Sequence, residues 1–451
     1  MQSPKVLPKQ DCIAAIATAA GRGGIGVVRV SGSNLTPMAA AILGKTCIPR
    51  RAIYTSFVDA QGQAIDQGIA LFYPAPHSYT GEDILELQGH GGTAVLALLL
   101  LRCQELGARL ALPGEFTQRA FLNGKIDLAQ AESVADLIDA TTSQAARSAM
   151  RSLQGDFSRA IHHLVNGLIN LRMLVEAMLD FPEEEIAATD FAQQQVQLSA
   201  LSAELGAVLD QAEQGSLLRE GAHVVLAGSP NVGKSSLLNR LSGEEVALVS
   251  EFPGTTRDII RQAIQIDGVP LHIMDTAGLR ESQDIVEQMG IARTRIMLQK
   301  ADVILVLQEA TCGAGAEGLK ILDELPPEIP RLYVFNKTDL LNEPPRVEKW
   351  GEETRIYLSA KTGEGLDLLR NKLLELIGWH QDAGIFMARE RHVRALKCAR
   401  DILTRATTEV GRAEIFAENL RLAQEQLSTI TGEVTPDDLL GEIFSRFCIG
   451  K

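Results

Sequence analysis

A glycine-rich segment at residues 228–235, with sequence GSPNVGKS, matches the phosphate-binding pattern G-x-x-x-x-G-K-[ST]. It follows the apolar run 224–227 and precedes a helical stretch at 236–241. In this context glycines let backbone N–H groups close around phosphates, and the helix N-terminus adds a favourable dipole. We expect Lys234 to reach the β- and γ-phosphate oxygens and Ser235 to bind Mg²⁺. The segment therefore predicts a nucleoside triphosphate site.

Two further segments supply groups for the metal and the γ-phosphate. The tetrapeptide DTAG at residues 275–278 ends the next strong strand candidate. Asp275 can hold the metal through water, and the Gly278 N–H can meet the γ-phosphate. The sequence TTRD at residues 255–258 lies in the loop between, where a threonine hydroxyl could complete the Mg²⁺ shell.

The base is read by two segments further along the chain. NKTD at residues 336–339 and SAK at residues 359–361 each end a strand candidate. The Asp339 carboxylate can accept hydrogen bonds from the ring N–H and the amino group of guanine, whereas adenine would leave it unsatisfied. The backbone N–H of Ala360 can serve the guanine oxygen. All these segments, in this order, predict a GTP-binding domain.

One departure from the usual pattern concerns hydrolysis. After D-x-x-G, Ras-like enzymes place a glutamine that orients the attacking water. This chain has Leu279 there, which can neither orient nor activate water. Glu287 and Glu281 follow on the same loop, and either could supply the missing polar group.

The elements that must position these residues alternate between strands and helices. Beyond residue 221, strand candidates occur at residues 224–227, 271–274, 303–307, 332–335 and 356–358, with helical segments between them. Such alternation predicts an α/β domain, a parallel sheet with helices on both faces.

The regions on either side differ from this domain in composition and in the secondary structure that they predict. Residues 1–123 mix β-rich runs at 13–16, 26–30, 68–72 and 84–87 with one clear helix at 93–106, which predicts an α+β domain. Apolar residues at 153, 157, 161, 164, 168, 171, 175 and 178 recur every three or four positions. This spacing predicts a long amphipathic helix that ends at residues 180–182. A second helix is predicted at about 191–218, and the chain beyond Trp379 is again helical.

An α/β domain inserted into a helical one explains this order, because domain termini often lie close together. We therefore predict a multidomain chain with an α+β N-terminal domain, a discontinuous all-α domain and an inserted Ras-like P-loop GTPase domain. The boundaries are predicted as 1–123 for the N-terminal domain, 124–218 and 379–451 for the helical parts, and 219–378 for the insertion.

Composition excludes several classes of protein. The 451 residues carry 43 Lys and Arg against 57 Asp and Glu, a formal net charge of −14, so the chain cannot coat nucleic acid by bulk charge. The longest purely apolar run, residues 94–101, is too short to cross a bilayer. The six cysteines are scattered without a C-x-x-C pair, which is typical of reduced thiols. We expect a cytoplasmic protein without membrane contact.

Over nearly its whole length the chain resembles the tRNA-modification GTPase family MnmE (TrmE). The likeness rests on GRGGIGVVRVSG at residues 21–32, GHGG at 89–92, PGEFTxRAFLNGK at 113–125, the GTPase segments above and the terminal FCIGK at 447–451. One departure is Ala19 and Ala20, where the family usually carries prolines. This change removes no functional group.

The resemblance implies an N-terminal domain that binds folate and dimerises, beside the helical and GTPase domains. It also implies an FAD-dependent partner of the MnmG/GidA family, in a heterotetramer or larger complex, that acts with the chain on certain tRNAs. The product would be a 5-carboxymethylaminomethyl wobble uridine, or the aminomethyl form when ammonium supplies the nitrogen. The one-carbon donor would be a 5-formyl or methylene tetrahydrofolate.

The family also implies roles for individual residues. Its K⁺ ligands fall on Asn231, Ser250, Phe252 and Thr255, and its Mg²⁺ ligands on Ser235 and Thr256. The water-orienting glutamate falls on Glu287 rather than Glu281. With Lys234, the GTP contacts comprise Asn231, Val232, Gly233, Ser235, Ser236, Ser250, Glu251, Phe252, Pro253, Gly254, Thr255, Thr256, Asp275, Thr276, Ala277, Gly278, Asn336, Lys337, Asp339, Ser359, Ala360 and Lys361.

The family's folate contacts fall on Arg29, Glu86, Lys125 and the terminal Lys451, and its terminal cysteine is Cys448, next to the expected one-carbon chemistry. Taken alone, Arg29 and Glu86 read as ordinary surface residues of strands.

Two charged segments each have two possible roles. Glu183–Glu185 could bind a metal or partner, but a charge run at a helix N-terminus explains them more simply. Basic residues at the start of the last helical region could contact RNA phosphates or form a solvated helix face: Arg389, Arg391, Arg394, Lys397 and Arg400.

Two other functions compete with modification by a two-protein system. One is a GTPase switch in ribosome assembly, and the other is a folate-dependent aminomethyl transferase that works without a partner. The folate-like N-terminal domain and the terminal CIGK argue against the first.

Overall fold

The computed structural model describes residues 11–180, 188–229, 231–244, 261–275, 301–311, 328–351, 353–380, 384–409, 411–433, 437–445, 447 and 450. The chain divides into two compact units. The first contains residues 1–135, 152–198 and 401–451, and the second contains residues 136–151 and 199–400.

The first unit begins with a six-stranded sheet whose strand order is β3-β4-β5-β2-β1-β6. All neighbouring strands are antiparallel except β1 and β6, which are parallel. The strands are β1 (Cys12–Ile16), β2 (Gly23–Gly32), β3 (Ile53–Val58), β4 (Ala64–Tyr73), β5 (Asp83–Gly91) and β6 (Ala108–Leu110).

Helices cover both faces of this sheet. Helices α1 (Thr36–Leu43) and α2 (Thr93–Glu105) pack on the face that carries Val28, Leu85 and Leu87. The other face presents Ile13 and Ala15 to Phe116 of helix α3 (Glu115–Leu122). Side chains alternate between the two faces along each strand, and those of β1 find apolar partners on both faces.

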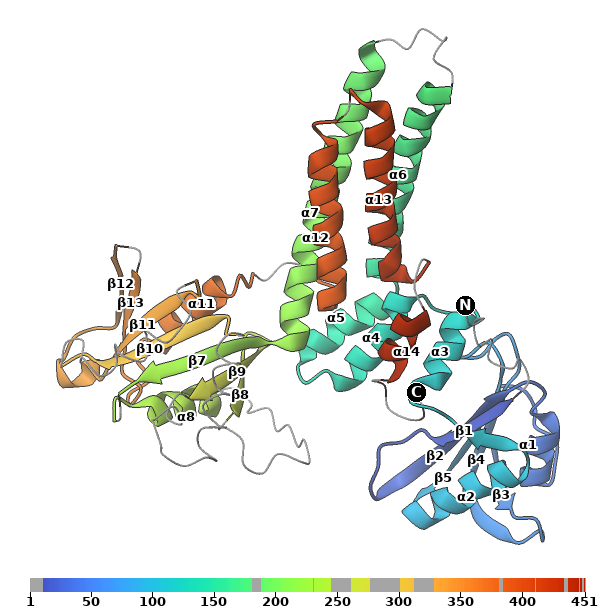
Figure 1. The fold of residues 1–451 in the computed structure, drawn as a ribbon. Coiled ribbons are helices and arrows are strands. Elements are labelled where there is room, and N and C mark those ends of the chain that lie inside the picture. The colour runs from blue at the N-terminus through green and yellow to red at the C-terminus, as the bar shows by residue number, and fades with distance from the viewer. Residues whose placement is uncertain are drawn as a thin grey trace, which may run out of the picture. The chain divides into compact units, whose positions relative to one another are not determined.

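Helices α6 and α13 of the first unit are long and lie side by side (Figure 1). In the first unit, α6 packs along α13, with Leu164, Leu168 and Leu171 buried and Arg172 Nη1 donating to Gln424 Oε1 at 2.8 Å. The helical elements are α4 (Leu128–Asp139), α5 (Ser143–Leu153), α6 (Asp156–Asp180), α7 (Ala188–Glu220), α12 (Glu390–Ala406), α13 (Ala413–Thr431) and α14 (Asp437–Ser445).

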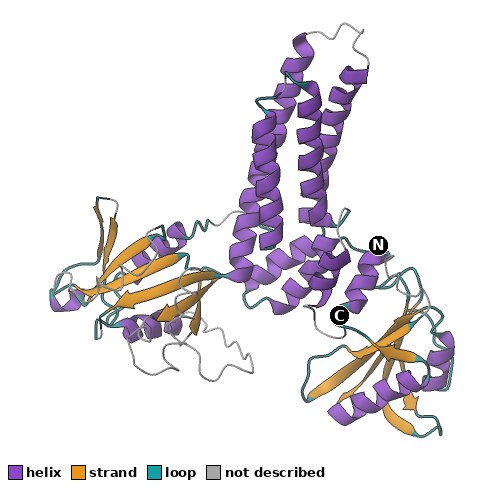
Figure 2. Ribbon diagram, in the orientation of Figure 1, coloured by secondary structure: helices purple, strands orange, loops and turns teal. Residues whose placement is uncertain are grey.

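The second unit holds a seven-stranded sheet of order β12-β13-β11-β10-β7-β9-β8, whose strands are labelled in Figure 1 and coloured orange in Figure 2. The five central strands run parallel, and β8 and β12 add antiparallel edges. The elements are β7 (Ala222–Gly228), α8 (Lys234–Glu244), β8 (Arg261–Ile266), β9 (Val269–Asp275), β10 (Val303–Glu309), β11 (Arg331–Asn336), η2 (Thr338–Leu340), β12 (Arg346–Trp350), β13 (Glu353–Tyr357) and α11 (Leu366–Leu376).

This sheet is buried on both faces, as its apolar runs indicate. Val224 and Leu226 face one core, which includes side chains of α8 and α11, while Val225 and Ala227 face the opposite one. A central strand of a parallel sheet needs such a continuous apolar sequence, because neither face meets water.

The predicted fold class is confirmed, and one helix boundary was wrong. The predicted helix from residue 153 begins instead at Asp156, because Gly155 adopts φ 88° and separates Leu153, the last residue of α5, from α6. Within the described residues, no helix is long and apolar enough to span a membrane.

Candidate functional site

The phosphate-binding loop follows β7 and leads into α8, as the sequence predicts. Asn231 and Gly233 have φ values of 64° and 99°, in the left-handed region that asparagine and glycine adopt most readily. The Lys234 Nζ donates to the carbonyl oxygen of Gly228 at 2.8 Å, so this side chain folds back across the loop. The ammonium therefore lies at the loop whose N–H groups would receive phosphates.

Asn336 joins this loop to the base-reading segments. Its side chain is buried, and its Nδ2 donates to the carbonyl oxygen of Val232 at 2.8 Å. Its Oδ1 accepts from the N–H groups of Lys337 at 2.8 Å and Ala360 at 2.9 Å. A Cβ at Gly233 would lie 2.3 Å from Asn336 Nδ2, so only glycine permits this close approach.

The two base-reading segments also contact each other directly. Asp339 Oδ1 accepts a hydrogen bond of 2.7 Å from Ser359 Oγ, which in turn accepts from the Thr362 N–H at 3.2 Å. These bonds fix the carboxylate at the carboxyl edge of the sheet. The Ala360 N–H, predicted to serve guanine, here donates to Asn336, so a guanine oxygen would share or replace that acceptor.

Other predicted residues lie outside the part of the chain that the structure describes. They are Ser250, Glu251, Phe252, Pro253, Gly254, Thr255, Thr256, Thr276, Ala277, Gly278, Glu281, Glu287, Cys448 and Lys451, together with Glu183–Glu185. Asp275 is the last residue of β9, which is described for its backbone.

The folate candidates Arg29 and Glu86 face each other across β2 and β5, where they are register partners. Arg29 Nη2 lies 2.8 Å from Glu86 Oε1. The Arg29 guanidinium carbon also lies 5.9 Å from the ring centroids of Tyr79 and Phe116. The pair is therefore half-buried beside two aromatic rings, rather than solvent-facing as the strand pattern alone indicates.

Lys125 contacts the loop at residues 74–82, which also contacts Arg29. Its Nζ donates to the carbonyl oxygen of Pro76 at 3.1 Å, and Asn123 Nδ2 donates to that of Thr80 at 2.7 Å. The loop also carries Tyr79, next to Arg29. One loop thus connects Lys125 with the Arg29 region. Sequence reasoning missed Tyr79, because a lone tyrosine in a loop gives no signal of its own.

Much of the PGEFTxRAFLNGK motif is structural. Glu115 is buried and accepts hydrogen bonds from Arg109 Nη2 at 2.6 Å and Arg119 Nη2 at 3.0 Å. Burial opposes its ionisation, but these bonds and that from the Leu112 N–H outweigh burial and hold the pKa of Glu115 below its ordinary value. Arg119 also pairs with Asp11 at 2.9 Å, which ties α3 to the start of β1.

The C-terminal segment packs against this same unit. A Cβ at Gly114 would lie 2.6 Å from the carbonyl oxygen of Phe444 and 2.9 Å from Phe447 Cβ. Gly450 is buried with φ 98°, and a Cβ there would lie 2.5 Å from the carbonyl oxygen of Ile16. Gly450 therefore lies against β1, whose neighbour β2 carries Arg29.

The basic residues at the start of α12 do not form one open edge. Arg389 Nη2 lies 2.8 Å from Asp136 Oδ1, with a side chain only 13% exposed. Arg394 pairs with Glu390 at 2.8 Å and Lys397 with Glu213 at 2.8 Å. Acidic side chains thus pair with Arg389, Arg394 and Lys397. RNA contact by this basic set stays a prediction, with a solvated helix face as its alternative.

The fold and the nucleotide site define a multidomain P-loop GTPase whose nucleotide domain interrupts a helical one. The family model of the MnmE helical domain matches residues 128–448, and that of the GTP-binding protein TrmE N-terminus matches residues 12–125. The chain is 59% identical over 451 residues to the tRNA modification GTPase MnmE of Nitrosomonas europaea, covering 99% of this chain and 100% of the relative. The chain belongs to the MnmE family.

Other proteins are similar to this chain over different extents. The tRNA modification GTPase MnmE of Chromobacterium violaceum is 58% identical over 441 residues, covering 97% of this chain and 98% of the relative. Among solved structures, Era of Aquifex aeolicus covers 40% of this chain, and 66% of Era is covered, at 25% identity and TM-score 0.28. The G domain of the T. maritima FeoB iron transporter covers 34% of this chain, and 98% of that domain is covered, at 26% identity and TM-score 0.27.

Proposed function

We propose that this chain is a K⁺-dependent GTPase that modifies C5 of the wobble uridine of certain tRNAs together with an FAD-dependent partner of the MnmG/GidA class. The added group is carboxymethylaminomethyl, or aminomethyl when ammonium is the nitrogen source. The observation that carries this proposal is the identity of 59% with a tRNA modification GTPase over the full length of both chains.

In this proposal GTP and Mg²⁺ bind where β7 meets α8. The loop fits a phosphate chain because Gly228 and Gly233 permit its close approach to Leu307 and Asn336, and because Lys234 lies beside it. Ser235 and Thr256 would hold Mg²⁺, which neutralises charge on the phosphates. Asn336, Asp339 and the segment at residues 359–361 would hold guanine. The contacts from residues 250–256 and 275–278 complete this site.

Hydrolysis would rely on groups that replace the glutamine missing at Leu279. Glu287 would orient the attacking water, and Asn231 would be one of the K⁺ ligands, with Ser250, Phe252 and Thr255. A monovalent cation at the phosphates neutralises developing negative charge as an arginine would. Turnover should therefore be much faster in K⁺ than in Na⁺ at matched ionic strength. Equal turnover in the two buffers would contradict the role of K⁺.

A one-carbon tetrahydrofolate would bind near Arg29, Glu86 and Lys125, with the terminal Lys451. Arg29 and Lys125 would attract its carboxylates, and Glu86 would accept hydrogen bonds from the donors of its ring. The flat rings of Tyr79 and Phe116 beside Arg29, and the contact of Gly450 with β1, support a site for a planar ligand next to the chain end. Cys448 would lie near the one-carbon unit.

We infer a cytoplasmic homodimer that joins its partner in a heterotetramer or larger complex. Residues 1–123 would form the folate-binding and dimerisation domain. Residues 124–218 and 379–451 would form the helical domain, and residues 219–378 the GTPase domain.

Nucleoside analysis of tRNA tests this proposal. Strains lacking this chain, or lacking the flavoprotein, should both lose the modified wobble uridine. Normal modification without this chain would overturn the proposal in favour of a switch in another process. Normal modification without the flavoprotein would favour a transferase that works alone.

A further inference from the structure

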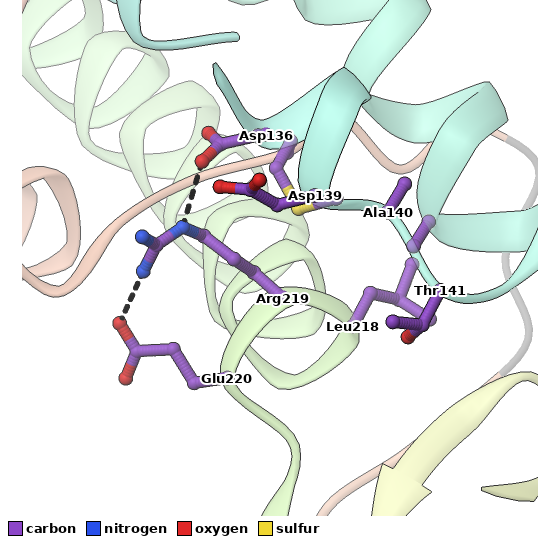
Figure 3. Close-up of a pocket in the computed structure, with 9 residues that line it drawn as sticks. Asp136, Asp139, Ala140, Thr141, Leu218, Arg219 and Glu220 are labelled. Atoms are coloured by element: carbon purple, nitrogen blue, oxygen red, sulfur yellow. Dashed lines mark hydrogen bonds and ion pairs between the residues drawn. The ribbon is translucent and has the colours of Figure 1, made fainter. Parts of the chain in front are cut away.

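A single buried carboxylate near the end of α4, that of Asp136, binds two arginines; Figure 3 shows its pair with Arg219. Asp136 Oδ1 lies 2.9 Å from Arg219 Nε and 2.8 Å from Arg389 Nη2, and its side chain is 5% exposed. All three residues belong to the second unit. One buried carboxylate therefore pairs with two guanidinium groups.

The two arginines stand where the chain enters and leaves the nucleotide-binding region. Arg219 lies near the end of α7, and β7 begins three residues later at Ala222. Arg389 directly precedes α12, which starts at Glu390. Asp136 thus ties both chain crossings to the same point.

The segment that begins at Asp136 makes further contacts with this region. A Cβ at Gly268, in the turn between β8 and β9, would lie 3.1 Å from Gln144 Cβ. The Met387 N–H donates to the carbonyl oxygen of Ser148 at 3.4 Å. Strand β9 ends at Asp275, the first residue of the DTAG segment. Residues 136–151 consequently belong with residues 199–400 in one compact unit, although the intervening residues 152–198 do not.

The two arginines bound to Asp136 differ in how exposed their side chains are. A pocket of about 160 Å³ lies beside Asp136 and is lined by Asp139, Thr141, Leu218, Arg219 and Glu220 among others (Figure 3). Arg219 is 33% exposed and also pairs with Glu220 at 2.9 Å, whereas Arg389 is 13% exposed. Arg219 can therefore leave Asp136 and interact with Glu220 or water alone, whereas the less exposed Arg389 stays bound to Asp136.

We propose that Asp136 is a positioning residue that couples GTP hydrolysis to tRNA modification. By fixing both crossings of the nucleotide-binding region, it passes a change at the nucleotide into α4 and the helical domain. Replacing it by asparagine removes the negative charge that Arg219 and Arg389 share, which weakens the link between the two crossings, while Glu220 still pairs with Arg219. The inference rests on the function proposed above, and it concerns coupling rather than the chemistry of either reaction.

The test compares Asp136→Asn with Asp139→Asn, the same change three residues later in α4, at an exposed carboxylate that also lines the pocket and forms no ion pair with a described residue. For each purified full-length variant, kcat and KM for GTP are measured, together with the wobble uridine modified per GTP hydrolysed. We expect Asp136→Asn to keep kcat within about twofold and to lose at least tenfold in modification per GTP. Asp139→Asn should change neither quantity.

Modification per GTP at the unmodified protein's value in Asp136→Asn would overturn the inference. A proportional loss of both activities would also overturn it, since a merely structural role predicts that result. If Asp136→Asn fails to fold, Arg219→Gln removes only the more exposed arm and should still lower the ratio, whereas an unchanged ratio overturns the inference. Absence of modification by the unmodified protein would instead overturn the proposed function.

Discussion

The side-chain amide of Asn336 donates a hydrogen bond of 2.8 Å to the carbonyl oxygen of Val232. The phosphate-binding loop and the base-reading segments come from chain positions more than a hundred residues apart, and this buried amide links them. The site's two halves are thus held together before any ligand contributes.

Asn336→Ala should weaken nucleotide binding about 10- to 100-fold. It removes the partner of the Val232 carbonyl and of the Ala360 N–H, and an unsatisfied buried polar group costs about 1–3 kcal/mol. Titration with a fluorescent GDP analogue measures the loss. Asn239→Ala, at an exposed position on α8, is the matched control and should bind normally. Equal affinity of the two variants would contradict the bridging role.

Glu287→Ala should leave nucleotide affinity nearly intact and slow hydrolysis by roughly 10²–10⁴-fold, because a water-positioning group acts mainly on the transition state. Asp339→Asn should instead weaken guanine recognition first. Single-turnover hydrolysis and binding assays separate the two effects. If Glu287→Ala hydrolyses GTP normally and Glu281→Ala does not, Glu281 rather than Glu287 orients the attacking water.

Glu115→Gln should destabilise the first unit by about 3–5 kcal/mol at neutral pH, since it leaves Arg109 and Arg119 without this buried partner. The folded-state pKa of Glu115 is lowered, so its contribution is present above the unfolded-state pKa of about 4.3 and is lost as pH falls through the lower folded value. Urea unfolding at pH 7 and at progressively lower pH should show the difference between variant and unmodified protein shrinking.

The control for Glu115 is Glu105→Gln, which breaks a pair on the surface of α2. It should cost less than about 1 kcal/mol. Similar losses in the two variants would refute the buried network as a source of stability.

Gly450→Val should impair tRNA modification while GTP hydrolysis stays near normal. A side chain at this position would collide with the Ile16 carbonyl oxygen at 2.5 Å and would also strain a φ of 98°. Deleting residues 448–451 should give the same separation. Modification assays in a strain lacking the natural copy provide the readout. Full modification by the deletion variant would mean that the tail, including Lys451, has no part in the folate site.

Local sequence predicted the central strands well, because each is an apolar run bounded by turns. Strands β7, β9, β10 and β11 include their predicted segments, and β13 overlaps the segment predicted at 356–358 but ends at Tyr357. The edge strands β8 and β12 were missed. Their sequences, RQAIQI and RVEKW, mix polar and apolar residues because one side of an edge strand has no neighbour.

The site was predictable where a motif implies a geometry, and not where a contact is long-range. The motif predicted a loop between a strand and a helix, and the structure has Asn231 in the loop after β7 and Lys234 as the first residue of α8. No local pattern indicates that Arg389 faces Asp136, 253 positions away, or that Tyr79 lies beside Arg29. Such pairs are fixed by tertiary packing, so an isolated arginine reads as a surface cation until the fold is known.

Reconstitution with purified components tests the central claim most directly. The full-length chain, the FAD-dependent partner, unmodified tRNA and a one-carbon tetrahydrofolate are combined in K⁺ buffer with GTP, with GDP or with a non-hydrolysable GTP analogue. Mass spectrometry then quantifies the modified wobble uridine. The account predicts modification with GTP and little with GDP or the analogue. Equal yields with all three nucleotides would contradict the claim that GTP hydrolysis by this chain drives tRNA modification.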